Sequence, residues 1–291
     1  MLEQLTACPI CGEKDFSKHL DTLDYTTTRE SFSIQRCDHC KLLITNPRPA
    51  KDSIEKYYKS DQYISHTGGG NTMIDSVYRS VRNITLNNKL TLINKYQSKF
   101  NLLDYGCGTG EFLATCKDAG WTVAGVEPSD EARVKNRKDL QVVDDLSKIT
   151  TSVNAITMWH VLEHVHELNE TLGRLRSLLT NNGTIFIAVP NHESYDGRYY
   201  KNFWAGYDVP RHLWHFSKDN IKTLLTRHNL RLQEIVPMKF DAFYVSLLSE
   251  GYKNPGRSTL ARSAAAFSRG MLSNLKAGKD NHSSLIYIAG T

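Results

Sequence analysis

The sequence feature that most constrains this chain is an apolar run that ends in three alternate glycines. Residues 102–105 lead into Gly106, Gly108 and Gly110, and a helix-like stretch begins at Glu111. Glycine has no Cβ and readily takes positive φ, so a ligand can approach the backbone at such a turn. The third glycine comes one position earlier than in the dinucleotide fingerprint G-x-G-x-x-G. The pattern therefore predicts a strand, a ligand-binding turn and a helix, and it disfavours NAD.

A second strand-like run, residues 122–126, is closed by Glu127. A carboxylate at the end of a second strand can accept hydrogen bonds from two ribose hydroxyls. Further strands, alternating with helical segments, are expected at residues 140–143, 153–158, 184–190, 230–236 and 283–289. This alternation predicts a doubly wound α/β sheet whose last strand is inserted antiparallel.

Three segments, in this order, resemble the successive motifs of class I S-adenosylmethionine-dependent methyltransferases. They are DYGCGTG at 104–110, VEPS at 126–129 and MWHVLEHV at 158–165. The resemblance covers residues 84–236. It implies a Rossmann-like sheet of seven strands with helices on both faces and S-adenosylmethionine over the carboxyl ends of the first strands.

The cofactor-binding residues that this resemblance implies are Asp104, Tyr105, Gly106, Cys107, Gly108, Gly110, Glu127, Pro128, Asp144, Asp145, Leu146, Trp159 and His160. The family places an acidic group near the adenine amine, which is the role expected for the two adjacent aspartates. A solvated loop is the alternative for that pair. For the cysteine in the turn, the alternative is a small packing residue.

Four of the six cysteines lie in the first fifty residues as two C-x-x-C pairs. Two such pairs can place four thiolates around one tetrahedral zinc ion, and the loop between them can lengthen without moving the ligands. A disulfide pair would need an oxidising compartment, and a thioredoxin-like redox motif would need a surrounding βαβ pattern. The predicted ligands of a structural zinc ion are Cys8, Cys11, Cys37 and Cys40.

The second cysteine pair is followed by Asn-Pro-Arg-Pro at residues 46–49. A similar arrangement occurs in bacterial methyltransferases with an N-terminal zinc-binding segment, many of them associated with sugars, cell-surface polysaccharides or secondary metabolites. The domains expected are a zinc-ribbon-like unit at 1–50, a helical linker or lid at 51–98 and a methyltransferase domain at 99–291, with a lid insertion at 190–216 and a basic helical segment at 251–279.

Residues 160–164 also match H-x-x-E-H, a zinc-peptidase signature that requires two histidines one helical turn apart. A peptidase needs this motif inside a helix together with a third ligand. Here the motif starts directly after an expected strand in a domain with a glycine-rich turn. We therefore expect these histidines at the ligand edge of an α/β sheet, without a catalytic zinc ion.

The segment after the fifth expected strand is long and rich in aromatic and ionisable side chains, which favours a binding lid over a plain connection. Its Pro-Arg-His-Leu sequence at 210–213 resembles the same family. Methyl transfer from a sulfonium requires an aligned acceptor and, for a hydroxyl or carbon acid, removal of a proton, for which histidine is suited. The candidate catalytic residues are His164, His192, Tyr207, Asp208, Arg211, His212 and His215. A hydrogen-bonded structural role is the alternative for each histidine.

The function expected is methyl transfer to oxygen or carbon of a small molecule, such as a sugar, a nucleotide-sugar or polysaccharide precursor, or a secondary metabolite. One alternative is a zinc-ribbon RNA methyltransferase that would use the six cations of residues 251–279, and another is a non-catalytic cofactor-binding protein. The formal charge of +5 is too mild to point to nucleic acid as the partner. The chain shows neither a bilayer-spanning run nor a signal peptide, so a cytoplasmic protein is expected.

Overall fold

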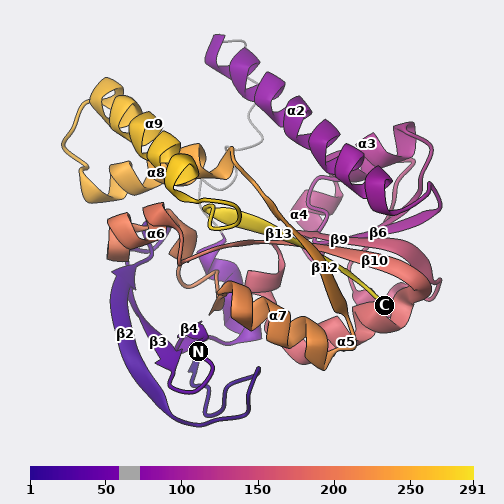
Figure 1. Ribbon diagram of the computed structural model, residues 1–291, viewed down its shortest axis with the longest axis horizontal. Helices are drawn as coiled ribbons and strands as arrows, with labels where there is room; N and C mark the ends of the chain where they lie inside the picture. The colour runs from indigo at the N-terminus through magenta and orange to yellow at the C-terminus, as the bar shows by residue number, and fades with distance from the viewer. Residues whose placement is uncertain (59–72) are drawn as a thin grey trace.

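The alternation of strands and helices builds one seven-stranded sheet in the computed structural model, which describes residues 1–58 and 73–291 (Figure 1). The strand order is β12-β13-β10-β9-β6-β7-β8, and β13 runs antiparallel to both of its neighbours. The strands are β6 Asn101–Tyr105, β7 Thr122–Val126, β8 Gln141–Val143, β9 Val153–Trp159, β10 Leu179–Pro190, β12 Arg231–Pro237 and β13 Ser284–Gly290. The expected doubly wound sheet with an antiparallel last strand is confirmed.

Helices cover both faces of this sheet because successive side chains of a strand point to opposite sides. Phe186 and Ala188 of β10 pack with α2 and α3, whereas Ile185 and Ile187 pack with α5 and α7. The helices are α2 Met73–Tyr96, α3 Glu111–Asp118, α4 Asp130–Arg133, α5 Leu168–Leu178, α6 Tyr195–Tyr200, α7 Lys218–Arg227, α8 Asp241–Lys253 and α9 Thr259–Lys276. In the described ranges, no helix has both the length and the apolar character needed to cross a membrane.

The helical hairpin of α8 and α9 lies beside the main sheet (Figure 1). Helix α9 falls within the expected basic helical segment, but α8 was not expected from the sequence. Its residues include Ala242, Phe243, Val245 and Leu248 on several sides, so they do not form the single apolar stripe that marks an amphipathic helix. In the linker expected at 51–98, the described parts are a 3-10 helix, η1 Lys51–Tyr57, and α2; residues 59–72 lie outside the described residues.

A second, four-stranded antiparallel sheet forms the N-terminal unit. Its order is β11-β4-β3-β2, with β2 Phe16–Leu23, β3 Ser31–Cys37, β4 Leu43–Thr45 and β11 Trp214–His215. The strand β11 comes from the segment predicted to be a lid of the methyltransferase domain. The amide of Thr45 also donates to the carbonyl oxygen of Leu213 at 3.0 Å. The N-terminal unit therefore shares a sheet with the lid segment, and the domain boundaries at residues 50 and 98 stay a prediction.

Arg211 joins the same two parts of the chain through a buried ion-pair network. Its guanidinium donates to Asp24 at 3.0 Å, to Asp208 at 2.6 Å and to the carbonyl oxygen of Tyr57 at 2.7 Å. The side chains of Arg211 and Asp24 are fully buried. Burial alone would raise the pKa of Asp208, but the charge of Arg211 lowers it to about 2. The network holds the turn after β2, the end of η1 and the lid segment together.

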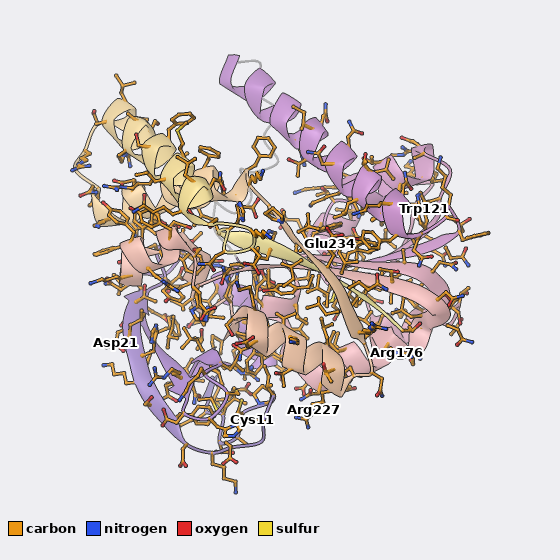
Figure 2. The ribbon with its side chains drawn as sticks, in the orientation of Figure 1. Cys11, Asp21, Trp121, Arg176, Arg227 and Glu234 are labelled. Carbon is orange, nitrogen blue, oxygen red and sulfur yellow. The ribbon has the colours of Figure 1, made fainter. Side chains whose placement is uncertain are left out.

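The loop that carries the first two predicted zinc ligands is fastened to the helices of the main domain. Arg227 of α7 donates to the carbonyl oxygens of Pro9 and Ile10, and Asn169 of α5 also donates to Pro9. Figure 2 shows Arg227 near Cys11, with side chains filling the space between the layers. These contacts anchor the cysteine loop against the face of the sheet that α5 and α7 cover.

Candidate functional site

The glycine-rich turn between β6 and α3 takes the left-handed conformation at all three glycines. The φ angles of Gly106, Gly108 and Gly110 are 76°, 54° and 73°. A Cβ atom at Gly106 would lie 2.5 Å from Val161, and one at Gly110 would collide with Asn136. At Gly108, in contrast, no described atom lies within 4 Å of the Cβ position. Gly108 is therefore the point at which the turn is open to a ligand.

Glu127 follows β7 and lies directly beside this turn. Its carboxylate accepts hydrogen bonds from the amides of Gly108 and Ser129, both at 2.9 Å. The carbonyl oxygen of Pro128 accepts a hydrogen bond from Arg133 at 2.7 Å. Two amides thus fix the orientation of the carboxylate, and each oxygen keeps a lone pair for a hydroxyl donor.

Asp104, at the end of β6, is buried below the turn and accepts a hydrogen bond from the Thr157 hydroxyl at 2.6 Å. Burial raises the pKa of Asp104 to about 7. Cys107 is also buried, and its sulfur lies 2.7 Å from the Cβ position of Gly125, so it fills the space under the turn. Tyr105 is partly buried against the main core. These side chains shape the turn from below, and their contact with a cofactor stays a prediction.

Trp159, at the end of β9, has a buried indole N–H with no hydrogen-bond partner among the described residues. Its ring meets that of Phe112 edge to face, with ring centroids 5.4 Å apart. The ammonium group of Lys89, on α2, lies 4.5 Å from the centroid of the Trp159 ring. Burial lowers the pKa of this lysine. A buried donor without a partner is rare, so the indole N–H is a group that a ligand could satisfy.

Asp144, Asp145 and Leu146 follow β8, as expected for the third strand. Asp144 pairs with Lys148 at 2.6 Å, and the Asp145 carboxylate accepts from the Ser147 amide at 2.8 Å, which caps the 3-10 helix η3 Leu146–Lys148. Both carboxylates thus have local partners, and Leu146 is buried. A role for these residues at an adenine ring stays a prediction.

His160 lies at the end of β9 between two carboxylates. Its Nε2 atom is 3.0 Å from Asp241, and its Nδ1 atom is 3.3 Å from Glu163. Burial by itself disfavours the charged ring, but the two carboxylates raise the pKa of His160 to about 10. Its φ of 57° is unusual for a residue with a side chain. The sequence does not reveal Asp241, because it lies 81 positions away on the helix that was not expected.

The H-x-x-E-H motif does not form a peptidase zinc site of the usual kind. Only a 3-10 turn, η4 Leu162–His164, follows the strand, so His160 and His164 do not share the face of an α-helix. His160 turns to Asp241, whereas His164 faces His212 with ring centroids 4.6 Å apart. The expectation that these residues lie at the carboxyl end of the fourth strand agrees with their position after β9.

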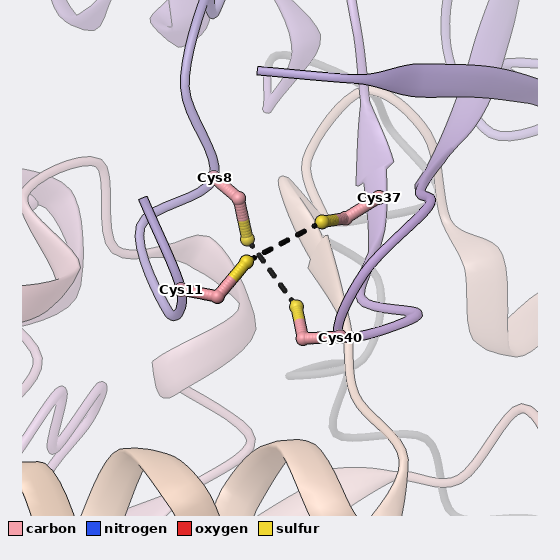
Figure 3. Close-up of side chains that lie close together, drawn as sticks. All are labelled: Cys8, Cys11, Cys37 and Cys40. Atoms are coloured by element: carbon pink, nitrogen blue, oxygen red, sulfur yellow. Dashed lines mark hydrogen bonds between the residues drawn. The ribbon is translucent and has the colours of Figure 1, made fainter. Parts of the chain in front are cut away.

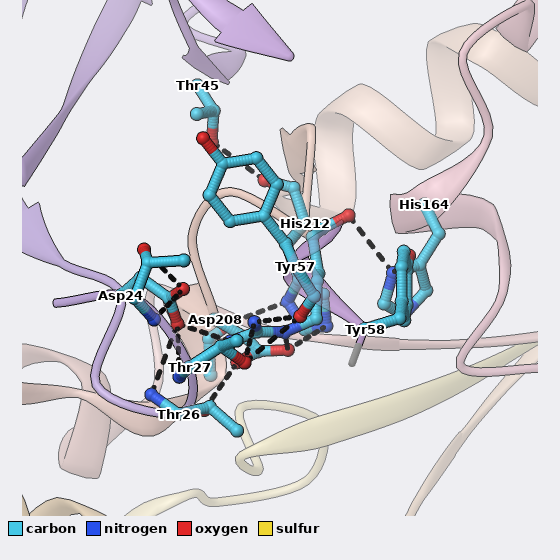
Figure 4. Close-up of polar contacts among 12 residues, drawn as sticks. Asp24, Thr26, Thr27, Thr45, Tyr57, Tyr58, His164, Asp208 and His212 are labelled. Atoms are coloured by element: carbon cyan, nitrogen blue, oxygen red, sulfur yellow. Dashed lines mark hydrogen bonds and ion pairs between the residues drawn. The ribbon is translucent and has the colours of Figure 1, made fainter. Parts of the chain in front are cut away.

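His164 and His212 form a polar cluster between the main sheet and the N-terminal unit (Figure 4). The Nδ1 atom of His164 lies 3.0 Å from both the Tyr58 hydroxyl and the Arg211 carbonyl oxygen. The Nδ1 atom of His212 lies 2.9 Å from the carbonyl oxygen of Gly206. Because a carbonyl can only accept, Nδ1 of His212 carries the proton in the neutral ring, and Nε2 has the lone pair.

Glu163 is the third member of this cluster. It is buried, its Oε2 atom has no partner among the described residues, and its ligand atom lies within 4.8 Å of those of His164 and His212. Burial lowers the pKa of His164 to about 4, so its ring is neutral at pH 7. One buried carboxylate and two imidazoles are thus in reach of each other, an arrangement that can move a proton or hold a metal ion.

A family model described as a methyltransferase domain matches residues 78–235, more than half of the chain. The chain belongs to this methyltransferase family. No curated protein matches its sequence.

One solved structure that is similar to the chain is that of mycolic acid cyclopropane synthase CmaA1 complexed with SAH and CTAB. The sequence identity is 13% over 70% of this chain and 83% of that one, and the TM-score is 0.50. Magnesium protoporphyrin IX methyltransferase (ChlM) from Synechocystis PCC 6803 with bound SAH matches at 13% identity over 81% of this chain and 97% of that one, with a TM-score of 0.53. At such identities the similarity concerns the fold alone.

Of the other predicted catalytic residues of this methyltransferase, Asp208 and Arg211 contact the His164 and His212 pair, at 3.9 Å and 3.0 Å. His215, on β11, is buried, and its Nε2 atom lies 3.0 Å from the Thr45 hydroxyl. Tyr207 packs edge to face on His215 with ring centroids 5.2 Å apart. His192 and Tyr207 line a pocket of about 650 Å³, and the buried Nε2 atom of His192 has no partner among the described residues. Asp208 and Arg211 belong to the buried ion-pair network.

The four cysteines of the N-terminal unit converge on one point (Figure 3). The sulfurs of Cys8 and Cys40 are 3.4 Å apart, those of Cys11 and Cys37 are 3.5 Å apart, and all four lie within 4.8 Å of one another. These separations are far longer than a disulfide bond of about 2.0 Å. Four thiolates bonded to zinc at about 2.3 Å lie about 3.8 Å apart, which is close to the observed spacing. The chain around the pairs forms turns and antiparallel strands, without the βαβ pattern of a redox motif.

We expect the methyltransferase to lose stability as the pH falls from 7 to 5. Burial lowers the pKa of His164 and of His192 to about 4, from an ordinary value of 6.5, and it lowers the pKa of His215 well below that ordinary value. The unfolded chain then binds protons that the folded protein excludes, which costs about 2 kcal/mol for each such histidine at pH 5. The raised pKa values of Asp104, about 7, and of His160, about 10, act in the opposite sense. Asp104 takes up a proton in the folded protein as the pH falls from 7 to 5, which offsets about 2 kcal/mol, and the contribution of His160 is lost as the pH rises from about 6.5 to 10.

Urea unfolding followed by tryptophan fluorescence at pH 7 and pH 5 measures this difference. Replacing His192 by phenylalanine, which carries no charge at either pH, should reduce it. Equal free energies of unfolding at the two pH values would contradict the buried, neutral state of these rings.

Proposed function

We propose that the protein is an S-adenosylmethionine-dependent methyltransferase that acts on oxygen or carbon of a small, sugar-like acceptor. The observation that carries the proposal is the open turn at Gly108 beside the Glu127 carboxylate, in a chain that belongs to a methyltransferase family. Both similar structures named above were solved with bound SAH, which agrees with this cofactor.

The residues at the turn fit S-adenosylmethionine in size and chemistry. Gly108 leaves room for a ligand against the backbone, Glu127 can accept from ribose hydroxyls, and the unpartnered indole N–H of Trp159 can donate to the ligand. Asp144 and Asp145 would lie toward the adenine. When bound, this cofactor supplies a methyl group that is already activated for transfer by its sulfonium.

We assign the general base to His212. Its Nδ1–H donates to Gly206, so Nε2 is available to accept a proton from an acceptor hydroxyl or carbon acid. That nitrogen lies 3.9 Å from the carboxylate of Asp208. Burial makes His164 a weak base with a pKa of about 4, so it suits a hydrogen-bonding role beside His212. Glu163 adds a second negative charge below the pair.

The pocket of about 650 Å³ between β2 and the lid segment is not lined by His212, so it suits a polyhydroxylated part of the acceptor that lies away from the methylated atom. Many of its lining residues are polar or charged, among them Asp21, His192, Arg198 and Asn202. A histidine with a free ring nitrogen suits a hydroxyl or carbon acceptor, which must lose a proton, more than a nucleophilic sulfur or amine. The resemblance of the N-terminal segment to sugar-associated methyltransferases points in the same direction.

RNA is the second candidate acceptor because part of the basic segment is combined with aromatic rings. The ammonium of Lys253 and the guanidinium of Arg269 lie about 4 Å from the Tyr199 ring centroid, and Lys276 lies 4.6 Å from that of Tyr195. Such cations attract phosphate, and their effect would appear as salt-dependent RNA binding. Binding of the cofactor without turnover on any acceptor would instead identify a non-catalytic protein.

We propose further that Cys8, Cys11, Cys37 and Cys40 hold a structural zinc ion. The cluster is anchored through Arg227 and Asn220, which donate to backbone carbonyls of both cysteine loops. Zinc would therefore join the two cysteine loops to each other, and the hydrogen bonds from Arg227 and Asn220 would connect them to α7.

Calorimetric titration with S-adenosylmethionine and S-adenosylhomocysteine tests the cofactor. We expect micromolar binding that is lost in Gly108→Arg, because the arginine would fill the open space at the turn. Gly278→Arg is the matched control, since its Cβ position is also free and its φ of 61° is also left-handed, but it lies in the connection between α9 and β13. The absence of binding to folded, zinc-loaded protein would overturn the methyltransferase proposal.

For any acceptor that supports turnover in a screen of sugars and sugar nucleotides, we expect His212→Gln to lower kcat by about 10²-fold to 10⁴-fold, as removal of a general base does. Cofactor affinity should not change, because His212 lies outside the turn. His228→Gln, at the carboxyl end of α7, is the control. A kcat close to that of the original protein would exclude His212 as the base.

Metal analysis of the purified protein should find about one zinc ion per chain, as a four-cysteine site predicts. Cys11→Ser should lose the metal and lower the melting temperature, because metal binding contributes directly to folding. Cys116→Ser, which removes a buried thiol outside the cluster, should retain the metal. A zinc-free protein with an unchanged melting temperature after chelation would refute the site.

A further inference from the structure

A pocket of about 370 Å³ lies beside the α8–α9 hairpin, where β12 ends and β13 begins. Its apolar lining comes from Pro237, Phe243, Met271 and Leu275. Because β13 is antiparallel to β10, its start lies at the carboxyl edge of the parallel strands. That edge is where open α/β sheets bind ligands.

Two polar atoms of the lining have no hydrogen-bond partner among the described residues, the Nδ1 atom of His282 and the Oδ1 atom of Asn274. His282 is only 4% exposed. The amide nitrogen of Asn274 donates to the carbonyl oxygen of Lys239 at 2.9 Å, which fixes the orientation of the side chain and leaves its oxygen free. Buried polar atoms are almost always hydrogen-bonded, so two unpaired atoms on residues that line one pocket set this pocket apart.

The charge of the lining is positive. Lys239 and Lys279 contribute to the pocket, and neither forms an ion pair with a described carboxylate. Among the described residues that line it, none is acidic. The nearest acidic residue in sequence, Asp280, is engaged by Lys218 at 3.0 Å. The two lysines are thus free to bind an anionic group.

We propose that this pocket binds a small organic anion, a carboxylate or phosphate ester with an apolar body. Lys239 and Lys279 bind the anionic group, and the apolar body lies on Phe243 and Met271. The pocket shares none of its lining residues with the turn at Gly108 or the His212 cluster. The proposal therefore does not depend on methyl transfer.

The fluorescent anion 8-anilinonaphthalene-1-sulfonate is a suitable probe, because it combines a sulfonate with an aromatic body. We expect saturable binding to the folded full-length protein. The double variant Lys239→Gln/Lys279→Gln should bind the probe about tenfold more weakly, the effect of losing two charged contacts. Met271→Glu should abolish binding, since it places a negative charge on the apolar wall.

Helix α9, which carries Met271, supplies the matched controls. Lys276→Gln removes a cation that lies over Tyr195, and Leu260→Glu changes an 82% exposed leucine of the first turn. Neither residue lines the pocket, so neither variant should change probe affinity. Far-UV circular dichroism and melting temperatures verify that every variant is folded.

Competition then identifies the anion. Octanoate and octyl phosphate should each displace the probe, and the stronger competitor distinguishes a carboxylate from a phosphate ester. Inorganic phosphate should compete at least tenfold less well, because it lacks the apolar body. The proposal is overturned if the pocket variants and the control variants bind the probe equally well, or if inorganic phosphate competes as strongly as the octyl compounds.

Discussion

The buried guanidinium of Arg211 is the interaction on which the geometry of the acceptor side depends. Its side chain binds Asp24 and Asp208, and its carbonyl oxygen lies 3.0 Å from the ring of His164. The next residue is His212, so the same short segment that joins the N-terminal unit to the lid also places the proposed base. Removing one partner of a buried ion pair costs about 3–5 kcal/mol, because a charge remains without compensation. The N-terminal unit is therefore part of the site's support.

The cofactor side depends on a different constraint, the left-handed turn after β6. Positive φ at Gly106 and Gly110 lets the chain pass close to Val161 and Asn136, and this close approach leaves Gly108 exposed to a ligand. The parallel strands bring the ends of β7 and β9 to the same edge, where Glu127 and Trp159 lie. A backbone conformation that only glycine adopts easily thus sets the position of side chains from three strands.

Much of the fold follows from local patterns. The apolar runs predicted all seven strands of the main sheet, and the cysteine spacing predicted the cluster, because both signals lie within short stretches of chain. The strand β11 has only two residues and depends on its pairing with β4, so no local pattern reveals it. Helix α8 was missed because its apolar residues lie on several sides. Asp241, the partner of His160, was missed for the same reason, because it is the first residue of α8.

The sequence by itself determined the succession of strands and helices along the chain, the ligand-binding turn and the residue types available for proton transfer. Only the tertiary structure decided which of the seven candidate catalytic residues lie together. It grouped His164 with His212, buried Arg211 in an ion-pair network and placed His215 against Thr45. It also brought Lys89 of α2 over the Trp159 ring. The physical reason is that turns and periodicity are local properties of the backbone, whereas pairing, burial and pKa depend on groups that folding brings together from distant parts of the chain.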